Sequence, residues 1–156
     1  MMNKEFMLKA IELSIENVKQ NKGGPFAAVV VKDNKIIATG VNCVTSCNDP
    51  TAHAEVTAIR NACQELGTFQ LDGCEIYTSC EPCPMCLGAI YWARPKAVYY
   101  GNTKADAAEI DFDDQFIYDE LDLPLNKRNL KMQEFMREEA LAAFKLWQEN
   151  NDKIEY

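Results

Sequence analysis

The chain has one histidine, and it lies two residues before a glutamate in the segment TAHAEVTA, residues 51–58. Further along, the segment TSCEPCPMCLGA contains Cys80, Cys83 and Cys86, three of the seven cysteines. Imidazole nitrogen and thiolate sulfur are ligands that zinc prefers in proteins. The sequence therefore raises the question of whether His53 binds a metal ion together with cysteines that lie far from it in the chain.

Two of the three cysteines are better placed than the third to bind a metal. Cys83 and Cys86 are three positions apart, so they share one face if a helix begins between them. Pro84 suits the first position of such a helix, whereas Cys80 lies at the end of the preceding predicted strand. We therefore expect Cys83 and Cys86 to be ligands and Cys80 to be a packed thiol. With His53 they give three protein ligands and an open fourth position, as in catalytic zinc sites.

Glu55 is placed to move protons at that open position. Water bound to zinc has a pKa of about 7, compared with about 15.7 in bulk water. A carboxylate beside this water can accept the proton that it loses. Residues two apart on a regular helix point about 200° apart. His53 and Glu55 can therefore serve one site only where the helix is just beginning, which the start signal Asp49-Pro50-Thr51 allows.

Each half of this pattern, taken alone, also occurs in proteins that do no such chemistry. A histidine two residues before a glutamate is common at surfaces and in cores, and a CxxC pair also occurs in redox dithiols. Cys80 as a fourth ligand would make the zinc structural. HxE followed by PCxxC at two helix starts is, however, the signature of zinc deaminases. The combination therefore predicts a hydrolytic deaminase.

Composition narrows the substrate and the compartment. A chain of 156 residues with 47% apolar and 26% charged residues fits one globular domain. The net charge of −8 argues against a nucleic-acid partner and favours a small uncharged substrate. The N-terminal segment is amphipathic, so we expect neither a signal peptide nor a membrane span. In the cytoplasm, where we place the protein, the seven cysteines are expected to be thiols or metal ligands.

Hydrophobic periodicity and turn residues predict helices that alternate with strands. The predicted helices cover residues 5–20, 49–67, 82–93 and 138–150, and the predicted strands lie within 26–42, which turns at Asp33-Asn34, 74–80 and 96–101. From residue 36 to 101 the alternation predicts parallel strands joined by right-handed helical crossovers. Both ligand segments fall at strand-to-helix corners, where such sheets bind their ligands.

The segments DPTAHAEVTAIR and YTSCEPCPMCLGAIYWAR resemble the cytidine-deaminase-like superfamily of zinc-dependent deaminases. Within it, the chain from GGPFAAVVVKD to the final EY is similar to the short bacterial guanine deaminases. The resemblance implies a three-layer α/β/α fold, with a mixed sheet flanked by helices, in a single deaminase domain over residues 1–156. It also implies one zinc ion per subunit on His53, Cys83 and Cys86, with Glu55 as proton shuttle in the hydrolysis of guanine to xanthine and ammonia.

The resemblance also suggests which residues bind the base. Asp113 or Asp114 offers a carboxylate that can accept from the N–H donors of guanine, and the family's FDD motif assigns the role to Asp114. Asn42 resembles the superfamily's base-binding asparagine, whose amide can both donate and accept. Phe26 is expected to stack on the base. The chain has Ala27 where the family often has glycine, which is expected to narrow the pocket slightly.

The C-terminal segment carries a further expectation from the same resemblance. In guanine deaminases of this type, that segment is exchanged between the subunits of a dimer and covers the partner's active site. The ending KIEY resembles the family's ending, so we expect a homodimer in which residues from about 138 to 156 are exchanged and Tyr156 closes the pocket. A frayed terminus is the alternative.

Other functions share the same motifs. A tRNA adenosine deaminase would use the same chemistry, and salt-sensitive binding of tRNA would support it. A deaminase of another small amine, such as cytosine, an aminated pterin or a triazine, is a second alternative. A non-catalytic zinc module is a third, and metal content without turnover of any base would favour it.

Overall fold

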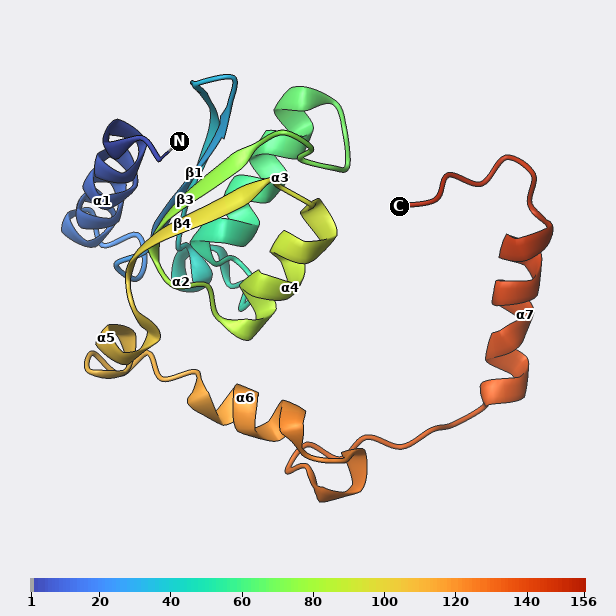
Figure 1. The fold of residues 1–156 in the computed structure, drawn as a ribbon. Helices are drawn as coiled ribbons and strands as arrows, with labels where there is room; N and C mark the ends of the chain where they lie inside the picture. Colours follow the sequence, from blue (N-terminus) through green and yellow to red (C-terminus); the bar gives the residue numbers. More distant parts are fainter. Residues whose placement is uncertain (1) are drawn as a thin grey trace. The chain divides into compact units, whose positions relative to one another are not determined.

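The computed structural model describes residues 2–156, which divide into two compact units, Met1–Gln115 and Phe116–Tyr156. The first unit contains a four-stranded sheet with the order β2-β1-β3-β4 (Figure 1). Its strands are β1 (Ala27–Lys32), β2 (Lys35–Val41), β3 (Glu75–Cys80) and β4 (Ala97–Asn102), and its helices are α1 (Lys4–Lys19), α2 (Val44–Cys47), α3 (Ala54–Leu66), α4 (Pro84–Ala93) and α5 (Lys104–Ala108).

The sheet is mixed, as predicted, but its strand order differs from a simple parallel succession. β1 pairs antiparallel with both β2 and β3, whereas β3 pairs parallel with β4. The strands β2, β3 and β4 therefore run in one direction, as the alternation with helices predicted. β1 lies between β2 and β3. Its hairpin with β2 turns at Asp33 and Asn34, both with the positive φ that tight hairpin turns require.

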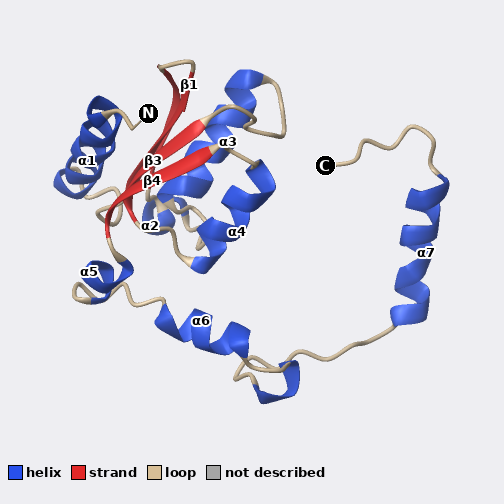
Figure 2. Ribbon diagram, in the orientation of Figure 1, coloured by secondary structure: helices blue, strands red, loops and turns tan. Residues whose placement is uncertain are grey.

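Helices cover both faces of the sheet, so the first unit has the predicted three layers (Figure 2). Successive side chains of β1 point to opposite faces, and they divide the core in two. Ala28 and Val30 pack in a cluster with residues of α3 and α4, whereas Val29 and Val31 pack in a second cluster with residues of α1. Helix α1 thus lies on one face and helices α3 and α4 lie on the other.

Helix α1 begins and ends one residue before the predicted range 5–20, and most of the apolar residues that indicated it are not buried. Its buried residues are Phe6, Ala10, Ser14 and Asn17. Of the apolar residues whose spacing indicated the helix, Phe6 is buried, whereas four others are 38–52% exposed and form a stripe on its outer side, namely Leu8, Ile11, Ile15 and Val18. The face of α1 that packs on the sheet therefore combines one aromatic residue, one alanine and two polar residues.

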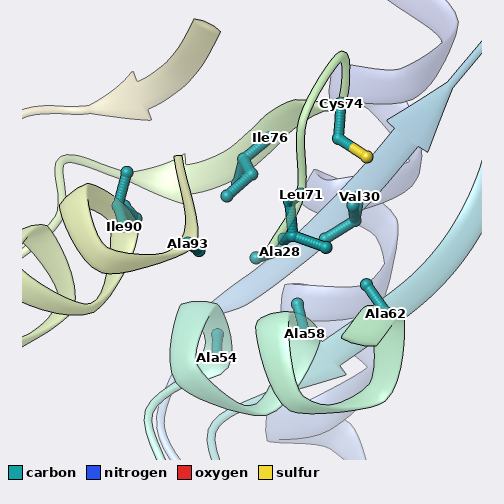
Figure 3. Close-up of a cluster of buried hydrophobic side chains, with 10 residues drawn as sticks. All are labelled: Ala28, Val30, Ala54, Ala58, Ala62, Leu71, Cys74, Ile76, Ile90 and Ala93. Carbon is teal, nitrogen blue, oxygen red and sulfur yellow. The ribbon is translucent and has the colours of Figure 1, made fainter. Parts of the chain in front are cut away.

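Helix α3 lies unusually close to the sheet because small residues line the contact. Ala54, Ala58 and Ala62 recur every fourth position of α3, and all three are fully buried in the core cluster (Figure 3). A Cβ atom on Gly40 of β2 would lie 2.3 Å from the main-chain oxygen of Ala54 and 2.3 Å from the nitrogen of Ala58. Gly40 therefore sets the depth at which the first turn of α3 sits against the sheet.

The second unit contains most of α6 (Gln115–Asp122), a short 3₁₀ helix η1 (Leu125–Lys127) and α7 (Arg137–Glu149). Helix α7 confirms the helix predicted over 138–150, whereas α2, α5 and α6 were not predicted. No residue of α6 or α7 is buried within the described chain. Across residues 2–156, no helix is both long and apolar enough to cross a membrane.

Replacement of Gly40 by alanine tests the close contact of α3 with the sheet. We expect Gly40→Ala to lower the free energy of unfolding by about 1–3 kcal/mol, because the added methyl group must push the helix outward. Chemical denaturation monitored by circular dichroism measures the change.

Gly88 offers the matched control, because a Cβ there meets nothing within 4 Å. It lies inside α4, so Gly88→Ala is expected to leave stability unchanged or raise it by up to about 1 kcal/mol. Equal stabilities for the two variants would show that the sheet does not limit the position of α3.

Candidate functional site

The start of α3 explains how His53 and Glu55 can serve one site. The helix begins at Ala54 rather than at the predicted Asp49, because Asp49 and Thr51 form a separate turn in which Oδ1 of the aspartate accepts from the threonine nitrogen at 2.8 Å. His53 is the N-cap residue and has extended backbone angles, φ −70° and ψ 158°. It is therefore not bound by the helical rotation that would have turned it away from Glu55.

The start of α4 presents the two cysteines in the way the sequence predicted. Cys83 is the N-cap residue, Pro84 is the first helical residue, and Cys86 is buried in the first turn. The free N–H groups and the dipole at a helix N-terminus stabilise negative charge, which favours thiolates. Two helix N-termini from distant parts of the sequence therefore supply all three candidate ligands.

The three side chains converge at distances that fit a zinc ion. His53 Nδ1 lies 3.5 Å from the sulfur of Cys83 and 3.5 Å from the sulfur of Cys86. All three ligand atoms lie within 4.8 Å of one another. In a tetrahedral site with Zn–N of about 2.0 Å and Zn–S of about 2.3 Å, nitrogen and sulfur are about 3.5 Å apart. The donor set and its spacing thus match a zinc site with a fourth position left for another ligand.

Cys80 stays outside this cluster. Its sulfur lies at the end of β3, where the thiol donates to the main-chain oxygen of Thr103 at 3.7 Å. Burial raises the pKa of this thiol to about 11, which keeps it protonated. Cys80 is therefore a packed thiol in the structure, as the sequence predicted, and the cluster has three ligands rather than four.

Contacts among the three candidate ligands shift their pKa values in different directions. Hydrogen bonds from Cys86 and His53 lower the pKa of Cys83 to about 4 and so favour its thiolate. Cys86 is the partner that keeps its proton, because its bond to Cys83 and its burial raise its pKa. The bond to Cys83 also raises the pKa of His53. A site that holds a thiolate among buried groups is well suited to a cation.

Glu55 lies in the first turn of α3 and is buried, with 6% of its surface exposed. Burial raises the pKa of its carboxyl group. Thr78 Oγ1 donates to Glu55 Oε1 at 3.3 Å and is itself buried on β3. A raised pKa suits a group that must both take up and release a proton near neutral pH.

Sequence reasoning did not single out Thr78, although it contacts the predicted proton shuttle. Every residue of β3 is buried, from Glu75 to Cys80. The strand therefore shows no alternation that would mark one side chain as facing a site. Its only signal was its place within the segment YTSC, close to the cysteines.

Asn42 follows β2 and is buried, with its groups held by the surrounding chain. Its side-chain oxygen accepts from the main-chain nitrogens of Gly24, at 3.2 Å, and Val44, at 3.4 Å. The amide nitrogen Nδ2 is in none of the hydrogen bonds recorded among residues 2–156. The sequence predicted an amide that both donates to and accepts from the base. The protein already uses the accepting oxygen, and donation from Nδ2 to a base stays a prediction.

The two aspartates of the FDD motif have different surroundings. Asp113 is exposed, and its carboxylate accepts from the main-chain nitrogen of Gln115 at 2.9 Å. Asp114 is half-buried, and its pKa is raised first by burial and then by the negative charge of Cys83. Asp114 therefore lies within electrostatic reach of the ligand cluster, whereas Asp113 caps the start of α6.

The two remaining candidate residues, Phe26 and Tyr156, lie in different units of the chain. Phe26 is half-buried at the start of β1 and packs edge-on against Phe112, with 4.9 Å between the ring centres. This pair brings the residue before β1 beside the segment that carries Asp114. Tyr156 belongs to the second unit, where its side chain is 69% exposed, and its role in closing a pocket stays a prediction.

The fold and the ligand cluster place the protein in a known class. Residues 1–102 match the family described as the cytidine and deoxycytidylate deaminase zinc-binding region. The chain therefore belongs to this family of zinc-binding deaminases, which agrees with the resemblance seen in its sequence.

Individual relatives match well beyond that region. Guanine deaminase of Bacillus subtilis is 57% identical over 99% of this chain and 100% of its own length. The crystal structure of guanine deaminase from Bacillus subtilis is similar to this structure, with a TM-score of 0.96, and the match covers 99% of each of the two chains. A tRNA-specific adenosine deaminase of Aquifex aeolicus is 34% identical over 89% of both chains.

Single cysteine replacements test the assignment of the ligands. We expect Cys83→Ala to weaken zinc binding at least ~100-fold and to lower the melting temperature, because two protein ligands cannot hold the ion as three do. Zinc per chain, measured by mass spectrometry after dialysis, gives the result. Cys80→Ala is the matched control and is expected to keep its zinc. Loss of zinc from the Cys80 variant alone would contradict the assignment.

Proposed function

We propose that the protein is a zinc-dependent hydrolase that deaminates guanine to xanthine and ammonia. The observation that carries this proposal is the 57% identity to a guanine deaminase over the whole chain. That match continues past the family region at residues 1–102 and so includes the segment with Asp114. The tRNA-specific deaminase is more distant, at 34% identity.

The chemistry follows from the ligand cluster and Glu55. His53, Cys83 and Cys86 hold the metal, and zinc bound there supplies a Lewis acid and a water molecule of lowered pKa. Glu55 accepts the first proton of the attacking water and passes it to the ring nitrogen, and it then takes the second proton from the added hydroxyl group and passes it to the leaving amine. Its burial raises its pKa, which makes the carboxylate a stronger base for the proton of water, and Thr78 holds one carboxyl oxygen in place.

Asn42 and Asp114 account for the preference for guanine. Guanine carries a carbonyl oxygen that accepts hydrogen bonds and ring N–H groups that donate them. Asn42 has its Nδ2 group left to donate, and Asp114 provides an acceptor close to the ligand cluster. Adenine lacks the carbonyl, so it would leave buried polar groups without partners, which is the basis of strong discrimination. Phe26 contributes its ring face or edge to the same pocket.

A parallel assay of candidate substrates tests the function. The zinc-loaded protein is offered guanine, adenine, cytosine, their nucleosides and tRNA, and ammonia release is measured. We expect release from guanine, with the other amines at least ~100-fold slower in kcat/KM, because the donor and acceptor pattern fits only guanine. Release from adenosine in tRNA would instead support the tRNA-modifying alternative, and zinc content without any release would favour a non-catalytic module.

The aspartate pair provides a matched test of base recognition. We expect Asp114→Asn to raise KM for guanine about 10–100-fold, because an amide replaces an acceptor that faces the N–H donors. Asp113→Asn changes the neighbouring residue in the same way, and its KM is expected to stay within about twofold, since Asp113 caps α6. Steady-state kinetics on the two variants decide between them, and the reverse order of effects would move the role to Asp113.

We also propose that the active form is a homodimer in which residues from about 138 to 156 are exchanged. The second unit supports this, because many of its large apolar side chains are 39–84% exposed, including Phe135, Phe144 and Leu146. The outer stripe of α1 is apolar and exposed as well. Exposed apolar surface of this extent is typical of proteins that associate. Tyr156, near the end of the exchanged segment, would then close the partner's pocket.

Mixed dimers can test the exchange directly. One subunit carries Glu55→Gln and an intact tail, and the other keeps Glu55 but lacks residues 154–156. If tails are exchanged, the mixed dimer contains one site with both Glu55 and a covering tail, so mixing two nearly inactive proteins restores turnover to about half of wild type per mixed dimer. No gain in activity on mixing, in dimers shown to exchange subunits, would mean that each tail serves its own subunit.

The state of the cysteines supports a cytoplasmic location. All seven are free thiols in the structure. Cys83 and Cys86 must stay reduced to bind a metal ion, which an oxidising compartment would not favour.

A further inference from the structure

Asn17 is a buried polar residue of α1 that the metal and base chemistry do not use. It is 3% exposed and faces the sheet beside Phe6, Ala10 and Ser14. Its amide nitrogen Nδ2 donates two hydrogen bonds of 2.8 Å, one to the main-chain oxygen of Gly24 and one to that of Asn42. One side chain of α1 therefore ties together two segments that are far apart in the sequence.

The hydrogen bond from Asn17 is one of several contacts that hold Asn42 in place. The Asn42 nitrogen donates to the oxygen of Phe26 at 3.0 Å, and its side-chain oxygen accepts from the nitrogens of Gly24 and Val44. Asn17 holds the main-chain oxygen of Asn42. Only the side-chain nitrogen of Asn42 is outside these hydrogen bonds. The bonds to the other polar atoms of Asn42 therefore set the direction in which this nitrogen points.

The Asn17 side chain binds the glycine turn and residue 42 at a point where these two segments are in close contact. A Cβ atom on Gly23 would lie 2.1 Å from the main-chain oxygen of Asn42, so the glycine turn rests directly against that residue. A Cβ atom on Gly24 would lie 3.2 Å from the rings of Phe26 and Phe112. The Asn17 amide therefore fixes the turn that contacts both the predicted donor and the aromatic pair.

The other end of the Asn17 side chain is not satisfied. Its oxygen Oδ1 is buried and has no hydrogen-bond donor among residues 2–156. Rotating the amide would give that oxygen a carbonyl on either side, so the observed orientation is fixed by the two acceptors.

We propose that Asn17 is a positioning residue for base recognition, which aims the Asn42 side-chain nitrogen at the substrate. This inference rests on the proposed role of Asn42 in binding the base. Asn17 does not touch the base itself. Its loss would let the glycine turn and residue 42 move apart, so that Asn42 would donate less effectively to the substrate in both the ground state and the transition state.

A double-mutant cycle on Asn17 and Asn42 tests this coupling. We expect Asn17→Ala to raise KM about tenfold with kcat within about twofold, because uniform binding is lost rather than chemistry. In the Asn42→Ala background the same replacement is expected to change KM by less than about twofold, since the donor it positions is gone. A purely structural role would instead lower activity and stability to a similar extent in both backgrounds, and that result would overturn the inference.

Ser14→Ala is the matched control. Ser14 is buried one turn earlier on the same face of α1, but its hydroxyl donates only to the oxygen of Ile11 in its own helix. We expect this variant to keep the wild-type KM. If Asn17→Ala does not fold, Asn17→Ser enters the same cycle, because its shorter hydroxyl cannot reach both carbonyl oxygens.

The cycle is run with whichever base the substrate assay identifies. Absence of guanine turnover would overturn the proposed function but leave the coupling between Asn17 and Asn42 measurable on the true substrate. Equal effects of Asn17→Ala in both backgrounds would overturn the role of Asn17 and leave guanine deamination intact.

Discussion

The meeting of two helix N-termini over one point is the constraint on which the site depends. His53 caps α3 and Cys83 caps α4, and Nδ1 of the histidine lies 3.5 Å from each ligand sulfur. A shift of either helix by one ångström would break the spacing that zinc requires. The close packing of α3 on β2 over Gly40 is therefore a condition for metal binding as well as for stability.

Two neighbouring groups of the site have pKa values shifted in opposite directions. Burial raises the pKa of Glu55, which suits a group that exchanges protons. The thiol of Cys83 is also partly buried, but hydrogen bonds from Cys86 and His53 outweigh that effect and lower its pKa. The site thus keeps a thiolate that can bind a metal beside a carboxyl group that can hold a proton. The hydrogen-bond partners of the two groups, rather than their degree of burial, cause this difference in pKa.

The residues proposed to recognise the base come from several elements. Asn42 follows β2, Asp114 precedes α6, and Asn17 comes from α1 on the other face of the sheet from α3 and α4. The donor and the acceptor proposed to read the base thus come from separate segments. Such a site can change its preferred base through single residues while the metal and the proton shuttle stay the same.

The sequence by itself predicted the candidate metal ligands and the proton shuttle from their spacing at two helix starts, and it determined the alternation of helices and strands through periodicity along the chain. The three-layer fold followed from the family resemblance of its motifs. Tertiary structure decided the rest. It put β1 between β2 and β3, turned Phe6 and Ala10 rather than the more apolar stripe of α1 toward the sheet, and separated Asp114 from Asp113. It also brought Thr78 to Glu55 and Asn17 to Asn42. Those contacts join residues 23 and 25 positions apart, and no spacing rule along one helix or strand reaches that far.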